Sequence, residues 1–93
     1  MKTISITRHV DFRTIYTNAV RISCTAFDLG LLCSVQEPTA EGMKEEEVLR
    51  LMMSLPHAKA LSRFLAETLH NFEQQFGLIR EVPVVLEPKE RGQ

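Results

Sequence analysis

The sequence predicts an α+β fold, in which an antiparallel sheet of three to four strands is followed by one long amphipathic C-terminal helix (β-β-β-β-α). Apolar and polar residues alternate in short segments of the first half, which is typical of half-buried strands, and a later stretch repeats apolar residues at helical spacing. At 93 residues, 44% of them hydrophobic, the chain suits a single domain over residues 1–93 with one modest core.

Three segments near the N-terminus have the character of strands. Residues 2–7 alternate cleanly, with Ile4 and Ile6 on one face. Residues 15–24 are rich in β-branched and aromatic side chains, and residues 29–35 place apolar side chains on one face. Because the connection between these last two segments is short, we expect them to form an antiparallel hairpin.

The next segment, residues 36–47, is predicted to be a solvated loop. It contains Pro38, Gly42 and a run of three glutamates. A fourth strand is expected over residues 48–54, "VLRLMMS", where apolar side chains occur on both faces.

The helix is predicted over residues 54–77. Ser54 is a favourable N-cap, Pro56 lies in the first turn where its missing N–H costs little, and Gly77 is a favourable C-terminal stop. At about 100° per residue, one apolar stripe forms, which we expect to cover one face of the sheet. The stripe comprises Ala58, Leu61, Leu65, Leu69, Phe72 and Phe76.

Surplus apolar side chains outside these faces predict self-association. Phe64 lies roughly 100° from the stripe, and several apolar side chains point to the sheet face that the helix does not cover. Residues 78–93 are expected to form an extended C-terminal tail, because prolines interrupt them. The sequence therefore predicts a homodimer or tetramer, with candidate interface residues Leu32, Met52, Phe64 and Val84.

Composition argues against nucleic acid and membrane partners. The formal net charge is −1, with 11 basic and 12 acidic side chains mixed along the chain, so no strong field attracts polyanions. The apolar runs are far shorter than the roughly 20 residues that span a bilayer, and the N-terminus lacks a signal-peptide pattern. We expect a cytoplasmic protein in which Cys24 and Cys33 are free, buried and structural.

The histidines do not predict a catalytic or metal site. His57 and His70 lie on one helix but project about 140° apart, so they cannot share one metal within a chain. His57 is expected to pack or cap in the first helical turn, His70 to lie on the surface, and His9 to lie in a link without a nucleophile nearby. We therefore assign no catalytic residue, no metal and no cofactor.

Several short motifs resemble a known family. The segments "NAVRIS", "MMSLPHAKAL" and "NFEQQFG" are similar to successive landmarks of the bacterial domain of unknown function 3467 family, over roughly residues 16–79. The resemblance implies strands followed by an amphipathic helix and supplies no catalytic residues. A looser similarity in topology to the SecB-type export chaperones would imply an oligomer that holds unfolded chains.

Three functions follow as hypotheses. The first is a non-enzymatic protein-interaction module that assembles with itself and binds an unidentified protein. The second is a SecB-like, peptide-binding chaperone, in which Met43, Met52 and Met53 line an adaptable groove for an unfolded peptide. The third and most remote is a small enzyme with a site at a subunit boundary, built from His57, Arg50 and Asp28.

Overall fold

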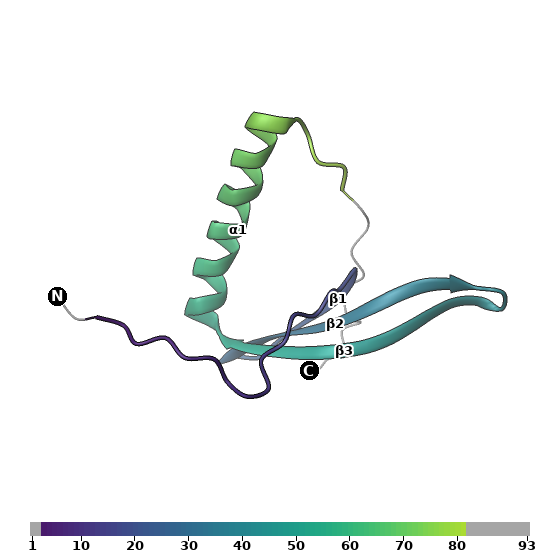
Figure 1. Ribbon diagram of the computed structural model, residues 1–93, viewed down its shortest axis with the longest axis horizontal. Helices are drawn as coiled ribbons and strands as arrows, with labels where there is room; N and C mark the ends of the chain where they lie inside the picture. Colours follow the sequence, from purple (N-terminus) through teal and green to yellow (C-terminus); the bar gives the residue numbers. More distant parts are fainter. Residues whose placement is uncertain (1–2, 82–93) are drawn as a thin grey trace.

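The structure is a computed structural model that describes residues 3–81, and these residues form three strands and one helix (Figure 1). In chain order, the elements are β1 (Ala19–Cys24), β2 (Asp28–Thr39), β3 (Gly42–Ser54) and α1 (Leu55–Phe76). The strands form one antiparallel sheet in the order β1-β2-β3. The predicted α+β class, with a sheet of three strands and one C-terminal helix, is confirmed.

A strand over residues 2–7 was predicted and is not formed in the described part of that range. Residues 3–17, here called the N-terminal arm, contain a turn at residues 10–11 but no helix or strand. The first residues of the arm point away from the sheet in Figure 1, with Ile4 and Ile6 exposed. An alternating pattern allows a strand, but a strand also needs a neighbouring strand, and residues 3–7 pair with none of the three strands.

The hairpin of β1 and β2 confirms the predicted antiparallel pairing, although β1 covers only Ala19–Cys24 of the predicted residues 15–24. Thr25 closes its turn, since its Oγ1 accepts from the N–H groups of Phe27 (3.1 Å) and Asp28 (3.0 Å). The register places Val20 opposite Cys33. This pairing gathers the alternating apolar residues of both strands on one face of the sheet, as predicted.

β1 begins later than predicted because Asn18 uses its side chain where a strand would use its backbone. Its Oδ1 accepts from the N–H of Gln36 (2.8 Å), and its Nδ2 donates to the carbonyl of the same residue (3.1 Å). The Asn18 amide thus satisfies both backbone groups of Gln36 and ends the β1–β2 ladder. Beyond this point β2 has a neighbour on one side only.

The prediction of a loop over residues 36–47 was wrong, because β2 and β3 extend through it as a long two-stranded ribbon. Ala40 and Glu41 make the turn between Thr39 and Gly42. Gly42 adopts a φ of 130°, which glycine tolerates and other residues rarely adopt. Pro38 is accommodated because it lies past the end of β1, in a part of β2 that is an edge on one side.

A β-bulge interrupts β3 at Val48. Cys33 lies opposite Leu49 and Ser34 lies opposite Glu47, so Val48 is an extra residue with no partner in β2. A bulge of this kind increases the local twist and bends the strand. The curved ribbon in Figure 1 is consistent with this irregularity.

α1 begins and ends where the sequence predicts. The Ser54 hydroxyl accepts from the N–H of His57 (3.3 Å), and Pro56 lies in the first turn. At the other end, the N–H of Gly77 donates to the carbonyl of Glu73 (2.9 Å), with Gly77 at a φ of 106°. These contacts satisfy backbone groups that a helix end otherwise leaves unpaired.

The helix does not cover the sheet, contrary to expectation. α1 follows β3 directly and rises steeply from one end of the sheet (Figure 1), so it contacts the strands only near that junction. Among the described residues, Cys33 is the only buried hydrophobic residue, and α1 has no buried residue. One chain therefore encloses almost no core, although it forms regular hydrogen-bonded elements.

Candidate functional site

The two faces of the sheet differ in chemistry. Because side chains alternate along strands, one face carries the apolar residues that pair across the sheet, and the other carries mostly polar ones. The apolar sheet face consists of Val20, Ile22, Cys24, Leu29, Leu31, Cys33, Leu49, Leu51 and Met53. The polar sheet face includes Arg21, Ser23, Gly30, Leu32, Ser34, Gln36, Glu45, Arg50 and Met52.

An ion pair organises the polar sheet face. The Arg21 guanidinium donates to the Glu45 carboxylate through both Nη1 and Nη2, and the Nη2 contact to Oε1 is 3.0 Å. Gln36 donates from Nε2 to the same Oε1 (3.0 Å). These donors lower the pKa of Glu45 from 4.5 to about 2, and Arg21 has a larger effect than Gln36. The pair links β1 to β3 across β2 and fixes the sheet near its middle.

Ser34 lies below this ion pair and is fully buried. Its hydroxyl is near enough to the Glu45 carboxylate to favour the charged form and lower the pKa further. Within the described part of the chain, however, the Ser34 Oγ makes no hydrogen bond. The adjacent depression is shallow and open, and it is lined by Arg21, Leu32, Glu45, Glu46 and Glu47.

The ion pair predicts a pH dependence of stability. The folded pKa of Glu45, about 2, is below its ordinary value of 4.5, so the charged form stabilises the fold above that value. The contribution should disappear as the pH falls from 4.5 toward 2. We expect Glu45→Gln to lower the urea midpoint at pH 7, and the difference from wild type to vanish near pH 2.

The matched control for this prediction is Glu46→Gln. This substitution removes the neighbouring carboxylate, which lies outside the Arg21 ion pair. Its effect on the urea midpoint at pH 7 should be smaller than that of Glu45→Gln. Equal effects of the two substitutions at every pH would show that the ion pair contributes nothing specific.

Exposed apolar side chains lie elsewhere, on α1 and on the apolar sheet face. Leu65, Leu69, Phe72 and Phe76 of the predicted stripe are 54%, 52%, 48% and 71% exposed. The rings of Phe72 and Phe76 contact each other, with their centroids 4.8 Å apart. On the sheet, Ile22, Leu49 and Leu51 are also exposed. An apolar surface of this extent is unusual in a monomer and is typical of an interaction surface.

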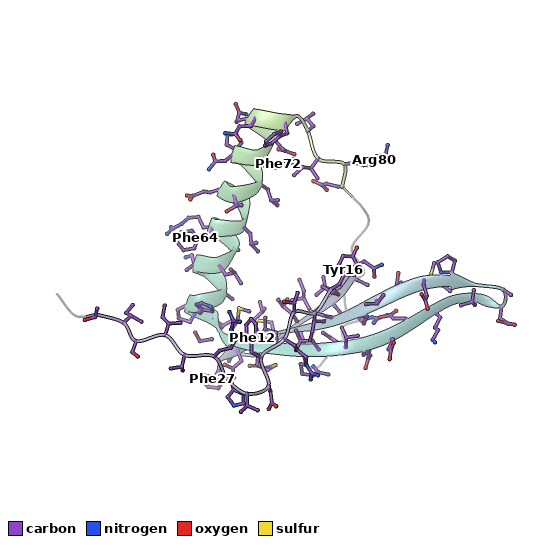
Figure 2. The ribbon with its side chains drawn as sticks, in the orientation of Figure 1. Phe12, Tyr16, Phe27, Phe64, Phe72 and Arg80 are labelled. Carbon is purple, nitrogen blue, oxygen red and sulfur yellow. The ribbon has the colours of Figure 1, made fainter. Side chains whose placement is uncertain are left out.

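The predicted interface residues are not gathered into one patch. Leu32 and Met52 lie on the polar sheet face, where Leu32 pairs with Arg50 and Met52 pairs with Gly30. Phe64 is 63% exposed on the side of α1 that faces away from the sheet, whereas Phe72 lies on the side above it (Figure 2). Val84 lies outside the described residues. A role for these residues in an interface stays a prediction.

The methionine groove and the remote catalytic group are not assembled within one chain. Met43 is nine residues from Met52, about 30 Å along β3, and Met52 and Met53 point to opposite faces. Arg50 is four residues from Ser54, the partner of Asp28, and so lies about 13 Å from it along the strand. Neither set of side chains can act together in the described chain.

The cysteines and histidines occupy ordinary positions. Both thiols are free, but only Cys33 is buried, and the prediction for Cys24 was wrong because this residue ends β1 at an exposed position. His57 and His70 are exposed on α1, and His9 Nδ1 accepts from the N–H of Asp11 (3.0 Å). Within residues 3–81, no three His, Cys, Asp or Glu side chains are placed to hold a metal ion.

Comparison with known proteins identifies the family. The sequence model of a family described as "Protein of unknown function (DUF3467)" matches residues 2–81. The chain belongs to the DUF3467 family. No curated protein and no solved structure matches the chain, so the looser similarity to SecB-type chaperones finds no support.

The family match covers more of this DUF3467 chain than its regular elements do. It includes the N-terminal arm as well as the sheet and α1. Within the described residues, the α1 helix is too polar to cross a membrane.

Proposed function

We propose that this DUF3467 protein is a non-enzymatic, cytoplasmic interaction module that works as a homodimer or a higher homo-oligomer. In this proposal, copies of the chain associate through the stripe of α1 and the apolar sheet face. The polar sheet face and Phe64 remain available for a different protein partner.

The observation that carries the proposal is the near absence of a core in one chain. The chain has an accessible surface of 8541 Å², whereas a compact monomer of its mass, 10.6 kDa, exposes about 5,500 Å². Its radius of gyration is 16.6 Å, compared with about 12 Å for a compact domain of this length. The open helix and the N-terminal arm both contribute to this excess.

A second copy of the chain is the most economical partner. Conformational entropy opposes folding at each ordered residue, and burial of one small residue such as Cys33 cannot offset it. The apolar surface must therefore be covered whenever the chain is folded. A second copy is always present at the same concentration, and twofold contacts between identical surfaces are the commonest form of assembly.

The mass of the protein in solution tests this proposal. Light scattering coupled to gel filtration, over a hundredfold range of concentration, should give an integral multiple of 10.6 kDa. At the lowest concentrations, dissociation should be accompanied by loss of cooperative unfolding, because folding and association are coupled. A folded monomer at every concentration would contradict the proposal. An oligomer that dissociates on binding an unfolded polypeptide would instead favour peptide holding.

A further inference from the structure

We infer that α1 pairs with α1 of a second copy in antiparallel orientation, about a twofold axis near Glu67. This inference rests on the proposed self-association and specifies its geometry. Three observations support it: the order of side-chain sizes along the stripe, the placement of charges on α1, and the exposure of the helix surface, which the sheet does not cover.

The stripe is nearly symmetric in spacing about Glu67 but asymmetric in size. Ala58, Leu61 and Leu65 precede this position at almost the same intervals at which Leu69, Phe72 and Phe76 follow it. The small and medium residues thus occupy the first half, and both aromatic residues occupy the second half. Two parallel copies of this stripe cannot pack evenly, because small side chains would meet at one end of the pair and large side chains at the other.

Antiparallel pairing brings large residues opposite small ones. Leu65 would lie opposite Leu69 of the second copy, and Leu61 opposite Phe72. Ala58 would lie opposite Phe76, the most exposed stripe residue at 71%. Such alternation gives layers of similar total volume, which close packing requires. A parallel pair would instead place Phe76 against Phe76 at one end and Ala58 against Ala58 at the other.

The charges favour the same orientation. Lys59 near the start of α1 and Glu73 near its end are 14 residues apart, so they project within about 40° of each other on one flank. In an antiparallel pair, residues of the same flank meet, and Lys59 of each copy would lie near Glu73 of the other. In a parallel pair, the same flanks lie on opposite sides of the pair, so Lys59 of one copy would not meet Glu73 of the other.

The helix dipole adds to this preference. α1 has no acidic residue in its first turn and no basic residue in its last turn, so its own side chains do not offset the dipole. In an antiparallel pair, the positive end of each helix lies beside the negative end of the other. The surface needed for this pairing is free, because α1 contacts its own sheet only at the junction with β3.

Disulfide trapping distinguishes the orientations. In a background with Cys24→Ser, two variants are made, one with Leu65→Cys and one with Leu69→Cys, and each is oxidised alone or after refolding as an equimolar mixture. In the antiparallel pair, positions 65 and 69 of different copies face each other, but like positions are offset by about 6 Å along the axis. With helix axes about 8–10 Å apart, that offset exceeds disulfide reach.

In the oxidised mixture, we expect the covalent dimer to be at least about tenfold more abundant than in either variant alone. Mass spectrometry should assign its disulfide bond to positions 65 and 69. The Cys24→Ser background, which keeps Cys33, is the control for disulfides that do not involve α1. Efficient crosslinking of each variant alone would establish a parallel pair and overturn the inference. An oligomeric mass without crosslinking in the mixture would also overturn it, while leaving the proposed self-association intact. A wild-type monomer would refute both.

Charge reversal provides a second measurement that does not depend on oxidation. Lys59→Glu or Glu73→Lys alone should raise the dimer dissociation constant about tenfold, and the double variant should recover most of the loss. Recovery is the decisive result, because Glu73 also accepts from the N–H of Ile79 (2.9 Å) and its replacement affects the helix end. The matched control is Arg63→Glu combined with Glu67→Lys, on the opposite side of α1. Failure of the double variant to recover would contradict the pairing.

Discussion

Leu65→Glu should abolish self-association at micromolar concentration. Leu65 is central in the stripe and 54% exposed in one chain, so in the proposed dimer the rest of its burial comes from the second copy. The variant loses apolar burial and places a carboxylate in each half of a dry interface, where an unpaired charge is strongly unfavourable. We expect a cost of at least about 4 kcal/mol, or roughly a thousandfold in the dissociation constant, measured by light scattering.

The control for this prediction introduces the same charge on the other side of the helix. Gln74→Glu lies opposite the stripe and should leave the mass unchanged. Because Leu65→Glu can also prevent folding, the milder Leu65→Ala serves as a second variant, which should shift dissociation to higher concentration. If the mass and the dissociation constant of both Leu65 variants matched those of wild type, the stripe would not be the association surface.

Leu51→Lys should weaken the assembly far more than Met52→Lys. The two residues are neighbours on β3 with similar exposure, 43% and 53%, but they point to opposite faces of the sheet. Leu51 lies opposite Leu31 on the apolar sheet face, which the proposal places in the interface. We expect at least about a hundredfold increase in the dissociation constant for Leu51→Lys, because a lysine charge is buried there.

The comparison between these neighbours decides which sheet face is covered. Met52→Lys should change the dissociation constant by less than about threefold, since the long lysine stem can extend into solvent from the polar sheet face. The reverse order of effects would show that Leu32 and Met52 form the interface. Sedimentation equilibrium at several concentrations would measure both constants under the same conditions.

Local signals in the sequence were sufficient for α1 and for the first hairpin. The Ser54 side chain is suited to the start of a helix, and the backbone freedom of Gly77 is suited to its end. Both residues make the expected capping contacts. The short segment at residues 25–28 left the adjacent strands no other way to pair than as a hairpin. In these elements the information is contained within a few neighbouring residues.

Two other elements depend on partners that a local pattern does not specify. Pro38 and the glutamates suggested a loop, but β2 has only one neighbour there and Glu45 is paired with Arg21 of β1. The alternation of Ile4 and Ile6 suggested a strand, but residues 3–7 pair with none of the three strands. Interactions between distant residues decided both cases.

The candidate surface shows the same distinction. The sequence revealed the stripe of α1, since helical periodicity identifies apolar positions directly. It assigned that stripe to the core of its own chain, because periodicity does not say which surface covers an apolar face. The angle at which α1 leaves β3, and hence the exposure of Leu65 and Phe72, appeared only in three dimensions.

The extra residue at Val48 marks a position where the length of this chain can change during evolution without a change of sheet faces. Residues 28–33 pair with residues 49–54, and residues 34–39 pair with residues 42–47, so one unpaired residue separates two regular halves of the hairpin. A homologue that lost this residue would pair Leu49 with Cys33 and Glu47 with Ser34 in regular alternation, so every side chain of the outer half would keep its face. Glu45 would stay beside Arg21, and the loss would remove only the bend and the extra twist that the bulge gives to β3.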